Sequence, residues 1–315
     1  MNRQNRVLVT GANGGLGRAL IASLIDLTPR GAAREMPRAL PDGVAGFAVG
    51  ALDAATDWSL PLQGVTQIVH CAALTYVPDV NAIAAEVQFQ TVNVAATVAL
   101  ARQAAHAGVK RLVHISSLTV NGKHSPDDGT PFMHLDQPHP ENAYARSKWD
   151  AEQALLAIAA ETGLEVVLVR IPRIVWPELT GNLALLEKLI TKGIPLPFGS
   201  ITQNGRDNIS GANLLSALRV CVTHPAAANQ TFLISDQNPL STRDLVIALG
   251  KRRRRRPMLV PVPAMLLRAI VMAVPARLLG KMNRDEMLNE LLLNLRIDSS
   301  HFTKLTGWVP HARLL

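Results

Sequence analysis

Cysteines, aromatic residues and long charge-free apolar runs are all scarce in this chain of 315 residues. Two cysteines are too few for a disulfide scaffold or for a zinc or iron–sulfur site built on several cysteines, and they fit a reducing compartment. Aromatic residues make up 4%, which argues against stacking of single-stranded nucleic acid. Hydrophobic residues reach 48% and charged residues 18%, so the chain can bury a core and global disorder is excluded.

Neither a secretory signal nor a membrane-spanning segment is predicted. The first apolar stretch, residues 7–9, runs at once into glycines and lacks the apolar region of a signal peptide. The most membrane-like part, residues 258–280, is interrupted by prolines and by Arg268 and Arg277, so it does not approach the ~20 apolar residues of a spanning helix. We therefore expect a cytoplasmic protein.

The net charge of +8 is concentrated in one basic run. Residues 251–256 carry six positive charges, which leaves 8 − 6 = +2 for the rest of the chain. A nearly neutral body predicts no nucleic-acid partner. Because an apolar stretch follows the run, contact of residues 251–280 with a membrane surface is an alternative, but a solvated loop is the preferred interpretation.

Short apolar runs alternate with helix-like stretches through the first half. Strands are predicted at 6–10, 67–70, 111–115 and 165–170, and helices at 17–27, 93–107 and 144–162. Such alternation is typical of a parallel sheet covered on both faces. Near residue 171 prolines become frequent, so a domain boundary is expected there. Helices beyond the boundary are expected at 183–192, 213–222 and 243–250.

A glycine-rich turn joins the first predicted strand to the first predicted helix. Its three spaced glycines fit a GxxGxxG pattern. Glycine permits close approach of a pyrophosphate, and the helix N-terminus presents free N–H groups to it. This context predicts a dinucleotide cofactor, with an ordinary glycine-rich turn as the alternative. The cofactor-binding residues of the turn are predicted to be Gly11, Asn13, Gly14, Gly15, Leu16 and Gly17.

The position that usually separates NAD from NADP favours NADP. About 20 residues after such a turn, an acidic side chain commonly holds the ribose 2′-hydroxyl of NAD. Here the strand end carries Arg34, with Arg38 nearby, and arginine suits the 2′-phosphate of NADP. If Glu35 held the ribose instead, NAD would be favoured over NADP. The other alternative is that both arginines are solvated surface residues. The expected cofactor is therefore NADP or NAD.

Tyr144 and Lys148 lie four residues apart on a predicted helix and so share one face. An ammonium group beside a phenol favours the phenolate, so the pKa of the tyrosine is expected below its usual value of about 10. The tyrosine can then exchange a proton with a substrate alcohol or carbonyl while hydride moves. Ser116 and Ser117 end a predicted strand, where such sheets bind ligands, and offer a hydroxyl to the reacting oxygen. A surface pair and a serine cap are the alternatives.

Together these segments resemble the extended short-chain dehydrogenase/reductases, the group of nucleotide-sugar epimerases, dehydratases and reductases. The resemblance covers nearly the whole chain. It implies a Rossmann-like, doubly wound parallel sheet over residues 1–170. It also implies a smaller α/β substrate domain, mainly over residues 171–315, with returns of the chain to the sheet. The segments that carry the likeness are 10–17, 70–73, 92–94, 115–122 and 144–148.

The resemblance implies roles for particular residues. In the family the catalytic serine or threonine lies five residues before the glycine that closes its loop, here Gly122, which implies Ser117 beside Tyr144 and Lys148. Relatives often have an aspartate at the adenine where this chain has Ala51, so Asp53 is the implied substitute. The remaining implied cofactor contacts are Ala72, Ala73 and Asn93.

The second half narrows the implied substrate to a UDP-sugar. Asn182 and Arg206 match family positions that contact the nucleotide diphosphate, and arginine is a bidentate phosphate donor. The likeness extends to the bacterial O-antigen or capsule branch. In the family, helices that correspond to the alanine-rich stretches 93–107 and 144–160 form a dimer interface, so the resemblance implies a homodimer, with helix faces packed on the sheet as the alternative. No metal is expected, because the histidines of the 121–140 loop match no metal-binding spacing, and that loop is interpreted as a mobile flap.

The leading hypothesis is a reductase of the C4 ketone of a UDP-4-keto-6-deoxy-N-acetylhexosamine in surface polysaccharide biosynthesis. Tyr144 would donate the proton, Lys148 would orient the ribose and Ser117 would polarise the carbonyl. The alternative is a UDP-hexose or UDP-N-acetylhexosamine 4-epimerase that uses the same residues. A third hypothesis, a non-catalytic NAD(P) sensor, is disfavoured because the chain has all three of these residues.

Overall fold

The computed structural model describes residues 6–78, 81–273 and 284–311. Its centre is a seven-stranded sheet in the order β3-β2-β1-β4-β5-β6-β9, in which every neighbouring pair is parallel. The strand order reverses between β1 and β4, which is the doubly wound arrangement, so the predicted fold class is confirmed. The strands are β1 (Val7–Thr10), β2 (Arg30–Ala33), β3 (Ala45–Ala48), β4 (Gln67–His70), β5 (Arg111–Ser117), β6 (Glu165–Ile171) and β9 (Thr231–Leu233).

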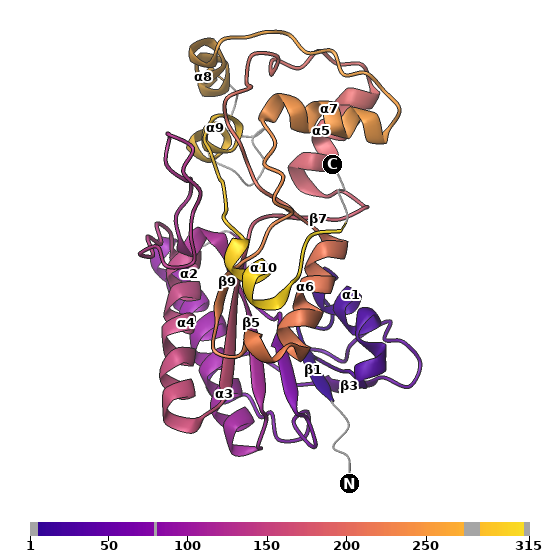
Figure 1. Cartoon of the computed structure of the whole chain (residues 1–315), viewed down its shortest axis with the longest axis vertical. Coiled ribbons are helices and arrows are strands. Elements are labelled where there is room, and N and C mark those ends of the chain that lie inside the picture. Colours follow the sequence, from indigo (N-terminus) through magenta and orange to yellow (C-terminus); the bar gives the residue numbers. More distant parts are fainter. Residues whose placement is uncertain (1–5, 79–80, 274–283, 312–315) are drawn as a thin grey trace.

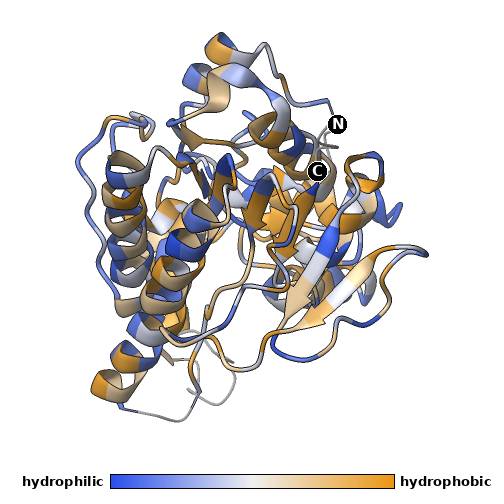
Figure 2. Ribbon diagram, turned by 90° about the horizontal axis from the view of Figure 1, so that it is seen from below, coloured by the Kyte–Doolittle hydropathy of each residue, from blue (hydrophilic) through white to orange (hydrophobic). Residues whose placement is uncertain are grey.

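Helices cover both faces of the sheet (Figure 1). One face carries α1 (Gly15–Ser23) and α6 (Gly211–Thr223), and the other carries α3 (Ala96–His106) and α4 (Ala143–Thr162). Successive residues of a strand point to opposite faces, so Val7 and Val9 enter the first core while Leu8 enters the second. The central strands are therefore mostly apolar, and Figure 2 shows orange strands in the middle of the sheet.

The weakly apolar strands β2 and β3 escape prediction. β3 is short and partly exposed, and in β2 close packing requires a small side chain. A Cβ at Gly31 of β2 would lie 3.1 Å from Ala12 Cβ and from Ile21 Cδ1. A large apolar residue cannot fit where β2 meets the glycine turn and α1, so the usual strand signal is absent. The helix expected at 93–107 also differs, because α2 (Ala82–Phe89) and a π-helical turn (Gln90–Ala95) precede α3.

The second half of the chain builds a separate lobe and then returns to the sheet. The lobe contains the short strands β7 (Ile174–Val175) and β8 (Ile209–Ser210). Its helices are α5 (Gly181–Thr191), α7 (Thr242–Arg252), α8 (Ala264–Ala273) and α9 (Arg284–Leu292), which share their own apolar core. The returning elements are α6, β9 and α10 (Ser300–Thr306), whose Phe302 packs edge-on against Phe232 of β9. In the described part of the chain, no helix combines the length and apolar character needed to span a bilayer.

A buried ion pair joins α4 to the sheet. Arg170 of β6 donates from Nη2 to Glu152 Oε2 of α4 at 2.6 Å, and their side chains are 4% and 0% exposed. Ser116 of β5 donates its hydroxyl hydrogen bond to the same carboxylate. Arg170 Nη1 also donates to Asn121 Oδ1 at 3.0 Å. One carboxylate thus fixes α4 against the carboxyl ends of β5 and β6.

We expect Arg170→Met to lower the free energy of unfolding by about 3–5 kcal/mol, because Glu152 would remain buried without its counter-charge. The double variant Arg170→Met/Glu152→Leu should recover much of this loss, since it removes both charges. Urea unfolding checks both values. The control is Arg219→Met, which breaks a pair with the exposed Asp26 and should lower the free energy of unfolding far less, because water screens that pair. Equal effects of the two Arg→Met variants would contradict the role given to the buried pair.

Candidate active site

The glycine turn packs too closely on its neighbours to tolerate side chains. Gly11 has φ +70°, and a Cβ there would lie 2.8 Å from the backbone N of Ala72. A Cβ at Gly17 would lie 2.3 Å from the carbonyl oxygen of Gly11. These contacts press the start of α1 against the ends of β1 and β4, where the strand order reverses.

The N-terminus of α1 fits a pyrophosphate. Gly14 is the N-cap residue of α1, and no side chain forms a capping hydrogen bond there. A Cβ added at Gly15 would meet no atom within 4 Å. The first N–H groups of α1 and the positive end of its dipole therefore face open space. This arrangement can hold the diphosphate of a dinucleotide cofactor.

Three residues predicted to contact the cofactor lie in the loops that follow β1, β2 and β3. Asn13 accepts from the backbone N of Arg38 at 2.8 Å and so fixes the loop after β2. Arg34 follows β2 with its side chain exposed, while Arg38 pairs with Glu35 at 2.7 Å. Asp53 accepts from the backbone N of Ala55 at 2.8 Å. Arg34 thus presents a positive charge directly after the end of β2, whereas the charge of Arg38 is balanced by Glu35.

Asn93 holds the loop after β4 rather than presenting its amide outward. The side chain is 1% exposed. Its Oδ1 accepts from Leu74 N at 2.8 Å, and its Nδ2 donates to Leu74 O and to Ser147 Oγ, both at 2.9 Å. Asn93 therefore joins the loop that carries Ala72 and Ala73 to α4. In this structure Asn93 therefore positions the loop after β4 relative to α4.

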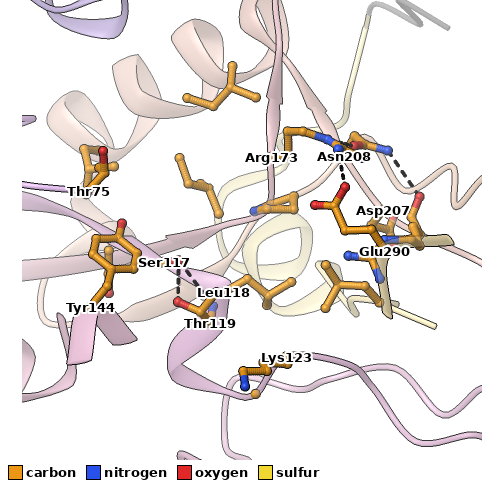
Figure 3. A pocket seen from close by; sticks show the side chains of 18 of the residues that line it. Thr75, Ser117, Leu118, Thr119, Lys123, Tyr144, Arg173, Asp207, Asn208 and Glu290 are labelled. Atoms are coloured by element: carbon orange, nitrogen blue, oxygen red, sulfur yellow. Dashed lines mark hydrogen bonds and ion pairs between the residues drawn. The ribbon is translucent and has the colours of Figure 1, made fainter. Parts of the chain in front are cut away.

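One cavity of about 590 Å³ brings together two of the predicted catalytic residues, Ser117 and Tyr144 (Figure 3), whereas Lys148 is buried and does not line it. Leu16 from the glycine turn, Ser117 from the end of β5 and Tyr144 from α4 all line it. The Ser117 hydroxyl forms hydrogen bonds with Tyr144 and, at 2.8 Å, with Thr119 Oγ1. A substrate oxygen beside Tyr144 would also lie beside Ser117, next to the residues that would hold the cofactor.

Burial controls the ionisation of the tyrosine–lysine pair. Burial raises the pKa of Tyr144, and the hydrogen bond with Ser117 opposes that rise. The prediction of a lowered tyrosine pKa is therefore wrong for this structure, because burial outweighs any effect of a neighbouring charge. Lys148 is 1% exposed, and burial lowers its pKa to about 8, while Glu152 and Cys71 act in the opposite direction.

The far end of the cavity carries two guanidinium groups. Arg206 Nη1 donates to the carbonyl oxygens of Asn289 and Leu293 at 3.2 and 3.3 Å, and its buried Nε has no hydrogen-bond partner in the described residues. Burial lowers the pKa of Arg206 to about 10, and Glu290 opposes that shift. Arg173 lies 3.3 Å from the Glu290 carboxylate. This end can accept an anionic group of a substrate.

The structure brings most, but not all, of the predicted substrate residues to the cavity. Asn182 is exposed on α5 and does not line it. Arg173 and Glu290 line it but were not singled out from the sequence. Arg173 follows the end of β6 by two residues, and the rule that ligands bind beyond strand carboxyl ends could have identified it. Glu290 gives no comparable signal, because its helix lies in the second lobe.

The 121–140 loop, interpreted from the sequence as a mobile flap, is hydrogen-bonded to the segment 294–298. Phe132 donates to Arg296 O and accepts from Asp298 N, both at 2.9 Å. His134 stacks on His301 of α10 with ring centroids 3.7 Å apart. These contacts fix the loop to the segment that follows α9, and so shape the cavity wall between the two lobes.

We expect Lys148→Met to raise the free energy of unfolding at pH 7 by up to about 3 kcal/mol while reducing activity. The folded pKa of about 8 lies below the unfolded value of 10.5, so the unfolded chain binds more protons between these values. Wild-type stability should therefore rise over this window and the advantage of the variant should shrink. Urea unfolding at pH 7 and pH 10 tests this, with exposed Lys110→Met as the control. A less stable Lys148→Met protein at both pH values would contradict the argument.

Comparisons with known proteins agree with this geometry. A model of the NAD dependent epimerase/dehydratase family matches residues 7–230. A UDP-glucose 4-epimerase of Vibrio cholerae is 40% identical over 313 residues, which cover 96% of this chain and 90% of that protein. A UDP-N-acetylglucosamine 4-epimerase from Bacillus cereus is 16% identical with a TM-score of 0.76, over 98% of this chain and 95% of that one. The structure of MoeE5 with UDP-glucuronic acid and NAD is 22% identical, with a TM-score of 0.71 over the same shares. The length of the family match and the 40% identity show that the chain belongs to the NAD dependent epimerase/dehydratase family.

Proposed function

We propose that the protein is a 4-epimerase of a UDP-linked hexose or N-acetylhexosamine. The observation that carries this proposal is a single cavity with Ser117 and Tyr144 at one end and Arg173 and Arg206 at the other. A nucleotide sugar matches this polarity, because its reacting alcohol and its diphosphate lie at separate places along one molecule. The 40% identity to a UDP-glucose 4-epimerase over nearly the whole chain supports this choice.

The chain's own groups handle the proton and the reacting oxygen. When bound, the nicotinamide of the cofactor takes up hydride from the sugar carbon and returns it. Tyr144 accepts the proton of the C4 hydroxyl as its phenolate, which the nearby Lys148 cation would have to stabilise against the burial that raises the Tyr144 pKa. It gives the proton back after the sugar has presented its other face. Ser117 donates a hydrogen bond to the same oxygen, which stabilises the charge that develops there. Buried Lys148 orients the ribose of the cofactor and supplies positive charge near Tyr144.

Two arginines would hold the substrate by its diphosphate. Arg206 is pre-positioned, because its Nη1 is held by two carbonyl oxygens while its buried Nε has no partner among the described residues. Arg173 is paired with Glu290, so a diphosphate would have to compete with that carboxylate. Anchoring the nucleotide while leaving the sugar free to turn is what an epimerase requires.

A reductase of a 4-keto sugar nucleotide is the second candidate. One observation favours it: the exposed Arg34 at the end of β2 suits the 2′-phosphate of NADP. A reductase consumes its cofactor stoichiometrically and must release it, whereas an epimerase restores its cofactor in each cycle. The same three catalytic residues serve either reaction, so the cofactor balance separates the two candidates.

A homodimer is part of the same proposal. The family resemblance implies an interface through the helices that correspond to α3 and α4. On α4, Leu156 is 42% exposed, which leaves an apolar side chain available on that surface.

The first test mixes purified protein with UDP-glucose, UDP-galactose or their N-acetyl counterparts, and follows both sugar configuration and reduced-nicotinamide absorbance. We expect interconversion at C4 without net absorbance change, and release of NAD when the protein is denatured. Stoichiometric loss of NADPH with a 4-keto sugar nucleotide would instead establish the reductase. Failure to turn over any of these sugars, with the cofactor still bound, would support a sensor.

We expect Tyr144→Phe to reduce turnover by at least about 10²-fold, because the proton carrier is removed while the ring remains. Cofactor affinity, measured by nicotinamide fluorescence titration, should change little. The matched control is Tyr76→Phe, which removes the hydroxyl of the chain's other tyrosine outside the lining of the cavity. Retained turnover in Tyr144→Phe would contradict the assigned role.

A further inference from the structure

One side of α8 is apolar and exposed. Leu267 and Val271 point inward and pack in the core of the second lobe, near Leu288 of α9. The remaining large apolar side chains of the helix are exposed: Met265 by 85%, Leu266 by 53%, Ile270 by 41% and Met272 by 56%. One stripe of the helix is therefore buried in the lobe, and its other apolar side is not covered by any described residue.

The segment that leads into α8 extends this surface. Met258 and Val260 are 56% and 44% exposed. Their backbones are fixed, because Val260 N donates to Leu196 O at 2.9 Å and Leu196 N donates to Met258 O at 2.8 Å. Two more apolar side chains are thus held outward on a hydrogen-bonded support.

The basic run belongs to the same lobe. It follows the end of α7 on the right of the second lobe, and the segment after it crosses the top of the lobe, away from the sheet, to α8 on the left (Figure 1). Arg252 and Arg253 pair with Glu187 of α5 at 3.6 and 2.8 Å, which anchors the run to the lobe. The other cations of the run, all exposed, are Lys251, Arg254, Arg255 and Arg256.

We propose that the surface formed by residues 251–273 docks on an anionic lipid bilayer. Exposed apolar side chains can enter the boundary between headgroups and acyl chains, while lysines and arginines attract acidic headgroups. Monomeric soluble proteins rarely leave a large contiguous apolar patch uncovered. The sequence alone favoured a solvated loop over membrane contact of residues 251–280. The exposed side of α8 reverses that preference, and residues 274–280 lie outside the described part.

Charge favours a bilayer over a second copy of the chain as the occupant. An interface between two copies through this surface would bring two basic runs together, whereas acidic lipid neutralises them. The absence of a spanning helix in the described residues agrees with a surface contact. Because α8 packs on α9, whose Glu290 lines the cavity, docking would place the candidate substrate site one helix away from the membrane. The proposal does not depend on which sugar is epimerised.

The test is co-sedimentation of the full chain with vesicles of phosphatidylcholine, with or without phosphatidylglycerol. We expect binding to the anionic vesicles, and weaker binding as salt screens the charges. The double variant Met265→Glu/Ile270→Glu should lose binding, because it places carboxylates on the inserting surface. The triple variant Arg254→Gln/Arg255→Gln/Arg256→Gln should weaken the partition coefficient by about fivefold for each charge removed.

The control variant is Leu135→Glu, which changes a side chain 79% exposed on the 121–140 loop and should leave binding unchanged. Thermal unfolding and turnover without vesicles should be the same for all variants, because the changed residues lie outside the cavity. No binding to anionic vesicles would overturn the proposal, as would equal binding to neutral vesicles. It would also be overturned if Met265→Glu/Ile270→Glu bound like the wild type, or if light scattering showed that this variant only dissociates a dimer.

Discussion

The buried carboxylate of Glu152 is the point on which the active site depends. It lies on the helix that carries Tyr144 and Lys148, and it binds Arg170 of β6 and Ser116, the neighbour of Ser117 on β5. The three residues proposed to be catalytic therefore lie on two elements, α4 and β5, that are joined by this one buried carboxylate. The same carboxylate partly offsets the burial that lowers the pKa of Lys148. The proposed mechanism needs the buried Lys148 to carry a positive charge, and the negative charge of Glu152 stabilises it.

The parts of the site visible in the sequence are those that a short segment determines by itself. The glycine turn follows from three glycines in one turn, and the shared face of Tyr144 and Lys148 follows from helix periodicity. β2 could not be recognised, because packing of Gly31 against α1 and the glycine turn selects a small residue there, and β3 is a short, partly exposed strand of small residues around Phe47. The pairing of Arg173 with Glu290 joins residues 117 positions apart and depends on how the two lobes meet. No local pattern encodes such a contact.

Asn93 shows that a residue can have a structural task that the sequence does not reveal. The family resemblance implies that it contacts the cofactor, which stays a prediction, and its three side-chain hydrogen bonds join the loop after β4 to α4. The raised pKa of Tyr144 is a similar case, because sequence spacing reports which groups are near each other but not how much water they lose. Both differences arise from burial, which is a property of the assembled layers.

The return of the chain to the sheet has a consequence for how the protein folds. β6 is complete at Ile171, yet its partner β9 begins at Thr231, so this edge of the sheet stays open until some sixty more residues have been synthesised. The intervening chain includes α6, which covers the same core that Phe232 of β9 enters. Such non-local pairing slows folding and exposes an apolar edge during synthesis. The nascent protein is therefore most vulnerable to aggregation while its second lobe is being made.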